Sequence, residues 1–484
     1  MSKLAPENVT LIRGLTLVAA ASIVIGNVIG TGVFLKARVM TCNVGTPGLV
    51  VAVWVAAGLL SLAGALTYAE LAAMMPRAGG EYVFVREAYG RPLGFLYGWM
   101  QIFIAKTGSQ ASLAVAFAIF FNDLTGGTLS RNFFTLDLLG FAVPFGGLQV
   151  MALGAIILFT VVNCAAVSVS GHVATVLTFV KIALVLGVGL GAFLLSRDGG
   201  FSNFGLANAG GACEGVDAAA RYGAAGFGAA MLGALWGYDG WNNLTLVAGE
   251  VKDPQRNIPR ALIFGMLVII TAYVFVNIAY FYALTPTEVA SVSKASSVAR
   301  EVALKVFGPV AVSLVAAGLL FSSVGSLHTS ILTGARVPYA MARDRLFFQS
   351  LARLSPRTHV PIGALILQGV WACVLALSGS FDTLTDYVVF GSWIFYGLTT
   401  ASVFIFRRRM PNAERPYRAW GYPVVPAVFL LVTGWLLVNT LMTTPVQALI
   451  GLGLIIIGLP VYWYWSSYNR RAGHRPADAG EGEG

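Results

Sequence analysis

The chain has 484 residues, of which 57% are hydrophobic and only 11% are charged. The charged share is about half that of an ordinary soluble domain, and the mean hydropathy is +0.77. A soluble enzyme, a disordered chain, a fibrous protein and a secreted disulfide scaffold are therefore excluded. The net charge of +10 fits basic loops on one side of a membrane, so we expect no nucleic acid partner.

Apolar segments recur along the whole chain, and a membrane-spanning helix needs roughly 20 such residues. Prolines, charges and Asn or Asp turns separate the segments. We therefore expect an all-α protein of the lipid bilayer. Its twelve predicted spans are roughly 14–35, 47–73, 93–121, 147–167, 173–196, 225–249, 260–284, 309–333, 361–379, 384–406, 424–441 and 446–465.

The distribution of basic residues predicts the orientation of these spans. The two termini and the loops on their side carry 21 Lys and Arg residues, whereas the opposite loops carry 8. Basic loops face the cytoplasm, so we expect both termini there, in a multi-pass protein of the plasma or inner membrane. Residues 1–13 form the predicted cytoplasmic N-terminus, and the polar residues 466–484 form a predicted disordered tail.

Glycines interrupt two of the predicted helices at membrane depth. Residues 25–34 (IGNVIGTGVF) lie in the first span, and residues 236–243 (WGYDGWNN) lie in the sixth. Such paired interruptions point to a transporter site, because unwound backbone needs a ligand, water or protein as partner. Helix N-termini attract a carboxylate and freed carbonyls attract an ammonium, and an amino acid zwitterion supplies both. Close helix packing at Gly26 and Gly30 is the alternative explanation.

Several motifs follow one another along most of the chain. They are GTG at 30–32, YAEL at 68–71 with PRAGGEY at 76–82, YDGWN at 238–242 with EVKDPQRNIP at 250–259, GAR at 334–336 with YAMARD at 339–344, and RPY at 415–417 with GYP at 421–423. Together they resemble the amino acid–polyamine–organocation superfamily, and most closely the L-type amino acid transporters. The resemblance implies the LeuT fold, with inverted five-helix repeats at 14–196 and 225–406 and two further helices at 424–465.

The resemblance also implies sodium-independent amino acid transport, and we expect exchange of neutral L-amino acids by alternating access. A proton-coupled amino acid symporter and a cationic amino acid transporter are alternatives. A membrane enzyme is disfavoured because the sequence has no HExxH, Walker A or GxSxG motif. A channel is also disfavoured, because it would need a selectivity filter repeated by symmetry or rings of charge, whereas this chain has two different broken helices. No cofactor and no metal site are expected.

The resemblance assigns roles to both helix breaks. The substrate carboxylate would meet backbone amides at 31–33, and the ammonium would meet carbonyls near Ile29, Trp236 and Asp239. The aromatic ring of Trp236 would close over the substrate. The predicted substrate-binding residues are Ile29, Gly30, Thr31, Gly32, Val33, Trp236, Gly237, Asp239 and Asn242, and the predicted side-chain pocket is Ile23, Asn27 and Trp393.

Two lysines lie inside predicted spans, where a charge is functional by default. Lys181 stands near a helix end and could extend its ammonium to the interface. By resemblance, however, Lys181 would link the first break to span 8 near Ser322 or Ser323, where related carriers hold sodium. Lys106 is expected to line the vestibule and to pair with a carboxylate.

Three carboxylates are candidates for recognition or gating. Asp239 could hold a cationic substrate, or it could cap the second half of the broken helix. Glu70 and Glu250 lie near predicted cytoplasmic helix ends. We expect them to close an inner gate by pairing with basic side chains, namely Arg77, Arg336 or Arg343.

The cysteines bear on partners. Animal light chains of this family carry a cysteine between spans 3 and 4 that binds a heavy chain, and residues 122–146 contain none. We therefore expect no disulfide-linked heavy chain. Cys42 and Cys213 both fall on the predicted outer side and could pair, although nothing in the sequence requires it.

Overall fold

The computed structural model describes residues 13–77, 79–138, 141–165, 170–294, 296–378, 381–443 and 445–471. Residues 1–12 of the predicted N-terminus and residues 472–484 of the predicted tail lie outside the described residues.

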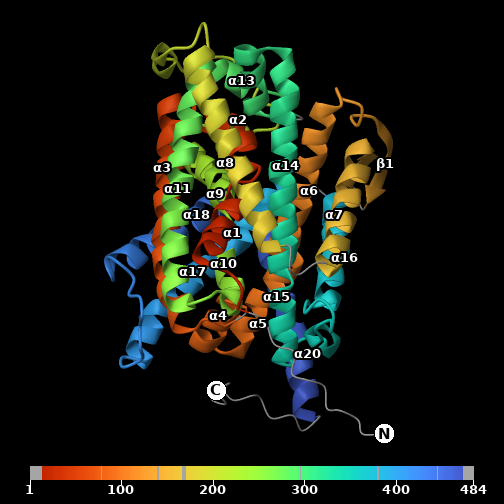
Figure 1. Ribbon diagram of the computed structural model, residues 1–484, viewed down its shortest axis with the longest axis vertical. Coiled ribbons are helices and arrows are strands. Elements are labelled where there is room, and N and C mark those ends of the chain that lie inside the picture. Colours follow the sequence, from red (N-terminus) through yellow and green to blue (C-terminus); the bar gives the residue numbers. More distant parts are fainter. Residues whose placement is uncertain are drawn as a thin grey trace.

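Long helices form a bundle with a common vertical direction (Figure 1). They are α1 (Leu17–Val28), α2 (Gly32–Val44), α3 (Pro47–Met74), α6 (Lys106–Leu124), α7 (Gly147–Ala165), α8 (Ser170–Leu195), α9 (Gly223–Tyr238), α11 (Pro254–Ala283), α14 (Pro309–Gly334), α16 (Ile362–Ser378), α17 (Phe381–Arg409), α18 (Val424–Thr443), α19 (Pro445–Ile456) and α20 (Gly458–Arg471).

Short elements connect the long helices and cover the two ends of the bundle. They are α4 (Glu81–Tyr89), α5 (Arg91–Met100), α10 (Asn243–Leu246), α12 (Pro286–Ala290), α13 (Val298–Phe307), α15 (Arg336–Arg343), the π-helical η1 (Gln101–Ala105), the 3-10 helices η2 (Phe201–Gly205), η3 (Ala218–Ala220), η4 (Ala248–Glu250) and η5 (Gln349–Ala352), and the strands β1 (Asn132–Leu138) and β2 (Phe141–Gly146). In Figure 1, α13 lies at the upper end, and α4, α5 and α15 lie at the lower end.

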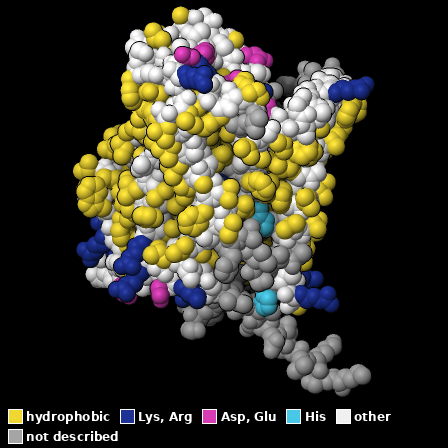
Figure 2. Space-filling model, turned by 45° about the horizontal axis from the view of Figure 1, so that its top comes forward, with side chains coloured by type: hydrophobic (Ala, Val, Ile, Leu, Met, Phe, Trp, Pro, Cys, Tyr) yellow, Lys and Arg dark blue, Asp and Glu magenta, His cyan; other side chains and the backbone are white. Residues whose placement is uncertain are grey.

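Ten helical segments of the described chain are long and apolar enough to cross a membrane. Their outward side chains are unsuited to water, since Leu194, Leu431 and Met442 are 76%, 74% and 78% exposed. Figure 2 shows hydrophobic side chains spread over the middle of one face, with charged side chains gathered towards its ends. Exposed apolar surface on this scale marks contact with lipid, so the chain is a multi-pass membrane protein.

The loop after α6 contains regular structure that the hydropathy pattern did not predict. Strands β1 and β2 pair antiparallel, with Thr135 opposite Pro144. This hairpin lies at the side of the bundle beside α7 and α16 (Figure 1). Its segments are too short and too mixed in character to be recognised as strands beside the much stronger signals of the spans.

The interior of the bundle surrounds the two interrupted helices. α1 packs against α8, α11 and α14, and α2 packs against α9. α1, α9 and α10 lie between the longer helices at intermediate height in Figure 1. The tertiary structure thus places the breaks in the middle of the molecule, away from both ends.

Candidate functional site

The first break separates α1 from α2 at residues 29–31. Ile29 ends α1, donating its N–H to the carbonyl of Ile25 at 2.8 Å. Thr31 begins α2, and its hydroxyl oxygen is buried without a hydrogen-bond partner in the described part of the chain. The first N–H groups of a helix have no partner within that helix. The start of α2 therefore presents free donors and the positive end of a helix dipole.

The second break separates α9 from α10 at residues 239–242. Asp239 leaves the helix with φ −65° and ψ 146°, and Gly240 follows with φ +105°. A side chain is strained at such a φ, so glycine allows the turn. α10 begins after Asn242 and has no side-chain cap. The interpretation of Asp239 as the cap of this half-helix is therefore wrong.

The two breaks lie against each other. A Cβ atom on Gly32 would stand 2.5 Å from the Cα atom of Gly237, so the backbones touch. The hydroxyl of Tyr273 in α11 lies 2.7 Å from the carbonyl oxygen of Val28 and 2.9 Å from that of Gly237, and its single proton can be donated to either oxygen. The predicted residues 29–33 and 236–242 thus form one buried region, although their roles in binding stay predictions.

Lys181 is a buried side chain of α8, and its exposed fraction is only 1%. Its ammonium donates to the carbonyl of Gly26 in α1 at 2.6 Å and to the hydroxyl of Ser326 in α14 at 2.7 Å. It therefore connects the first interrupted helix with α14 instead of reaching an interface. The predicted neighbours differ: Ser322 donates to the carbonyl of Gly30 at 3.4 Å and Ser323 to that of Leu320 at 2.8 Å. Ser326 lies one turn further along the same helix.

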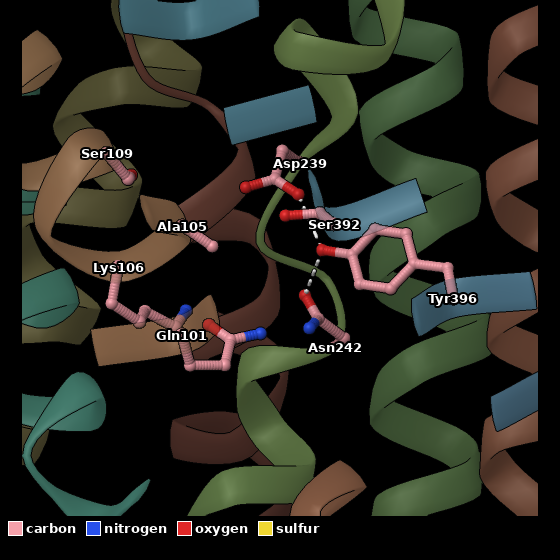
Figure 3. A pocket seen from close by; sticks show the side chains of 8 residues that line it. All are labelled: Gln101, Ala105, Lys106, Ser109, Asp239, Asn242, Ser392 and Tyr396. Atoms are coloured by element: carbon pink, nitrogen blue, oxygen red, sulfur yellow. Dashed lines mark hydrogen bonds between the residues drawn. The ribbon is translucent and has the colours of Figure 1, made fainter. Parts of the chain in front are cut away.

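A small polar pocket adjoins the second break (Figure 3). Its lining residues are Gln101, Ala105, Lys106, Ser109, Asp239, Asn242, Ser392 and Tyr396. The Tyr396 hydroxyl donates to Asp239 at 2.7 Å and lies 3.3 Å from the side-chain oxygen of Asn242. Lys106 faces the same pocket, but its ammonium bonds the side chain of Asn243 and not a carboxylate.

The predicted side-chain pocket is only partly assembled around these groups. The buried Ile23 accepts a hydrogen bond from Asn27 through its carbonyl at 2.9 Å. Asn27 in turn lies beside Gly240, since a Cβ atom added to Gly240 would lie 3.2 Å from the Cβ atom of Asn27. Trp393 stacks on Phe429 and does not line the polar pocket, although it contacts Tyr396.

The two candidate gating carboxylates have different partners. Glu250 pairs with Arg336 at 3.3 Å, as predicted. Glu70 pairs with Arg407 of α17 at 2.7 Å and with Arg415 at 3.4 Å, and not with any of the predicted arginines. The sequence could not indicate Arg407, because that residue lies 337 positions further along the chain.

The sequence predicted no role for three residues that the structure places in this region: Glu81, Ser326 and Tyr396. Glu81 is fully buried beneath the second break and accepts a hydrogen bond from Asn242 at 2.9 Å. Glu81 is the acidic residue of the PRAGGEY motif. A charged residue directly after two glycines was the sequence feature that could have indicated a functional role. Tyr396 and Ser326 lie in apolar helices where no local pattern distinguishes them.

This arrangement defines a class: polytopic membrane proteins in which two interrupted helices meet inside the bundle. Residues 15–463 match the sequence profile of the amino acid permease family, and the chain belongs to that family.

Named relatives cover most of the chain. The large neutral amino acids transporter small subunit 2 of Homo sapiens is 30% identical over 472 residues, which is 94% of this chain and 82% of the relative. The b(0,+)-type amino acid transporter 1 of Oryctolagus cuniculus is 29% identical over 413 residues, covering 85% of this chain and 80% of the relative. The human b(0,+)-type transporter is 28% identical over 96% of this chain and 90% of its own length.

Proposed function

We propose that this protein is a sodium-independent exchanger of neutral L-amino acids that works by alternating access. The observation that carries the proposal is the contact between the two helix breaks, together with the lysine ammonium between α1 and α14. A fixed ammonium there takes the place of a bound cation, so no sodium ion is needed to join these helices. The names of the relatives, which describe transporters of amino acids, support the substrate class.

We further propose twelve spans in the LeuT fold. Besides the ten long apolar segments, α16 would form one span and α9 with α10 would form the interrupted one. The two five-helix repeats would be 14–196 and 225–406, followed by helices at 424–465. The excess of basic residues in the loops of one side supports cytoplasmic termini in the plasma or inner membrane.

The substrate zwitterion would lie between the two breaks. Its carboxylate would accept from the N–H groups of Thr31, Gly32 and Val33, since the start of α2 offers donors without helical partners. Its ammonium would donate to carbonyls of Ile29 and Trp236. Gly30, Gly237 and Asn242 would form the backbone around it, with Ile23, Asn27 and Trp393 near the substrate side chain. Lys106, Glu70, Glu250, Arg336, Ser322 and Ser323 would support coupling or gating.

The chain would work without a disulfide-linked heavy subunit and without enzymatic activity. The segment between α6 and α7, where the animal light chains carry their linking cysteine, has none. The lipid bilayer and the amino acid itself are the partners that the proposal requires.

The test uses purified protein in liposomes in sodium-free buffer. Uptake of a labelled mixture of neutral amino acids is measured with and without unlabelled amino acids inside. Exchange predicts uptake that requires internal amino acids and does not respond to added sodium. Uptake into empty liposomes driven by a proton gradient would instead identify a symporter.

A second candidate, acceptance of cationic amino acids, rests on Asp239. Its carboxylate lines the polar pocket next to the break and accepts from Tyr396 at 2.7 Å. A buried carboxylate at this place could balance the charge of a lysine or arginine side chain.

Asp239→Gly should abolish uptake of arginine and lysine while neutral amino acids are still exchanged. Tyr396→Phe is the matched control, because it removes the hydrogen bond but leaves the charge in place. It should lower cationic uptake less than Asp239→Gly does. An equal loss of neutral and cationic uptake in Asp239→Gly would assign a structural role to this residue.

A further inference from the structure

Glu81 is a carboxyl group buried next to the second helix break, and no lysine or arginine of the described residues is paired with it. Its exposed fraction is 0%. One carboxylate oxygen accepts from Asn242 at 2.9 Å, and the other has no hydrogen-bond partner among the residues that the structure describes. A fully ionised carboxylate in such a place is costly, and structures that retain one generally use it.

The turn before Glu81 holds the carboxyl against the broken helix. Gly80 has φ +45°, and a Cβ atom on it would lie 2.5 Å from the hydroxyl of Thr245. The N–H of Gly79 donates to the carbonyl of Leu246 in α10 at 3.1 Å. The turn and α10 are therefore in direct contact, which fixes the position of Glu81 relative to the second break.

A continuous set of hydrogen bonds joins Glu81 to the polar pocket. Asn242 donates to Glu81, and the Tyr396 hydroxyl lies between Asn242 and Asp239 (Figure 3). A change in the charge of Glu81 therefore alters the hydrogen bonds of Asn242 and Tyr396, which lie at the break that we propose for substrate binding.

The ionisable groups around Glu81 come from five other parts of the fold. Tyr68 of α3, Tyr97 of α5 and Tyr396 of α17 face it with neutral hydroxyls, Lys106 of α6 is the nearby cation, and Asp239 is the second carboxylate. The hydroxyls of Tyr68 and Tyr97 lie close without ideal hydrogen-bond geometry. On its own helix, Arg86 is engaged by Glu87 and Asp344.

Counting charges in this cluster gives one cation and two carboxylates. A zwitterionic substrate with a neutral side chain adds no net charge, so the closed site would retain one unbalanced negative charge if both carboxylates were ionised. Burial raises the pKa of Glu81 to about 7, although hydrogen bonds and Lys106 oppose the shift. Asp239 accepts a hydrogen bond from the Tyr396 hydroxyl at 2.7 Å, whereas one carboxylate oxygen of Glu81 has no partner among the described residues, so Glu81 is the group that takes up a proton near neutral pH.

We propose that Glu81 is a proton-binding site of the transport cycle, protonated when the site closes on a neutral amino acid and ionised when it closes on a cationic one. The inference rests on the proposed transport function. Exchange of a cationic for a neutral amino acid would then move no net charge across the membrane. The positive charge carried by the cationic amino acid in one direction equals that of the proton carried with the neutral amino acid in the other.

The first test measures exchange of a neutral amino acid in liposomes, with equal pH on both sides, from about pH 6 to about pH 8.5. The protonated form predominates below the raised pKa, so wild-type exchange should fall above about pH 7, by up to about tenfold per pH unit for one proton. Glu81→Gln keeps the shape of the protonated group and should exchange at a rate independent of pH. Glu87→Gln, on the same helix, is the matched control and should keep the wild-type decline.

The second test needs only the wild-type protein, in case Glu81→Gln fails to fold. Binding of leucine to purified protein in weak buffer near about pH 7.5 should take up close to one proton per site, followed with a pH dye, whereas arginine should cause no uptake. Wild-type exchange independent of pH, a wild-type decline retained in Glu81→Gln, or no proton uptake with leucine would overturn the proposal. Absence of exchange at every pH would instead refute the transport function itself.

Discussion

Lys181 carries a charge in the interior of a membrane protein and uses it to join two helices. Both of its hydrogen bonds are short, at 2.6 and 2.7 Å, and they reach α1 and α14. A charged donor contributes about 1.5–3 kcal/mol in such a bond. The ammonium also satisfies the carbonyl of Gly26, which the start of the break makes accessible.

Lys181→Ala should lower exchange at least about tenfold, because the loss of roughly 1.4 kcal/mol already changes an equilibrium tenfold. Insertion into the membrane should persist, since the helix becomes more apolar. The measurement is uptake per unit of protein in liposomes, with insertion checked by protease protection. Lys305→Ala, which removes an exposed partner of Glu288, is the control. Full activity in Lys181→Ala would remove the lysine from the mechanism.

The sequence predicted Lys181 as a functional residue but did not predict its hydrogen-bond partner. Lys181 itself was identifiable, because a lysine among apolar residues stands out. Its partner Ser326 was not, because Ser322, Ser323 and Ser326 all lie in one short stretch of α14. Only the rotation of that helix decides which hydroxyl faces the ammonium.

At the scale of elements, the approach of α2 to α9 depends on glycine. The Cβ atom that alanine would add at Gly32 meets the backbone of Gly237 at 2.5 and 3.0 Å. Backbone cannot move aside as a flexible side chain can, so the two half-helices would be forced apart.

Gly32→Ala should therefore reduce transport by more than about tenfold, since a misplacement of about 1 Å can cost about a hundredfold in a positioned site. Gly154→Ala is the control: it lies in α7 with no atom within 4 Å of the added Cβ, and it should leave transport unchanged. Transport is measured in liposomes at equal protein content. Normal transport in Gly32→Ala would show that the breaks need not touch.

The Glu70 carboxylate fastens three elements together. It lies in α3 and is 1% exposed, and it accepts from Arg407 of α17 at 2.7 and 3.0 Å and from the N–H of Ala419 at 2.7 Å. Removing one partner of a buried ion pair leaves the other charge uncompensated, which costs about 3–5 kcal/mol.

Glu70→Gln should consequently lower the thermal unfolding midpoint of the purified protein by several degrees. In Glu288→Gln, which removes a pair with Lys305 whose carboxylate side is 45% exposed, the midpoint should change little, because exposed pairs contribute about 0–1 kcal/mol. Fluorescence-monitored melting in detergent compares the two variants. Equal midpoints would mean that the Glu70 pair does not stabilise the fold.

On the scale of the whole molecule, a disulfide closes the end of the bundle opposite α4 and α15. Cys42 at the end of α2 is joined to Cys213 in the segment between α8 and α9, 171 positions away. The same segment is also held by backbone bonds, from Asn208 to Gly45 at 2.8 Å and from Tyr222 to Asn43 at 2.6 Å. The half-helix α2 and this segment are therefore tied together at several points.

Peptide mapping without reductant should recover the Cys42 and Cys213 peptides as one species, while Cys164 and Cys373 react as free thiols after unfolding. The double substitution Cys42→Ser with Cys213→Ser should lower stability by about 2–4 kcal/mol. A melting midpoint unchanged from the wild type would mean that the hydrogen bonds alone hold the segment.

The class of protein, the positions of the long helices and the two glycine-containing breaks could be predicted from the amino-acid sequence alone. These features follow from local composition: apolar length sets a span, and glycine with unwound polar backbone sets an interruption. Which side chains contact one another became clear only from the three-dimensional packing of the helices. The pairing of Glu70 with Arg407, the choice of Ser326 and the burial of Glu81 under Asn242 join segments far apart in the chain. Such contacts depend on helix rotation and packing, which no local pattern encodes.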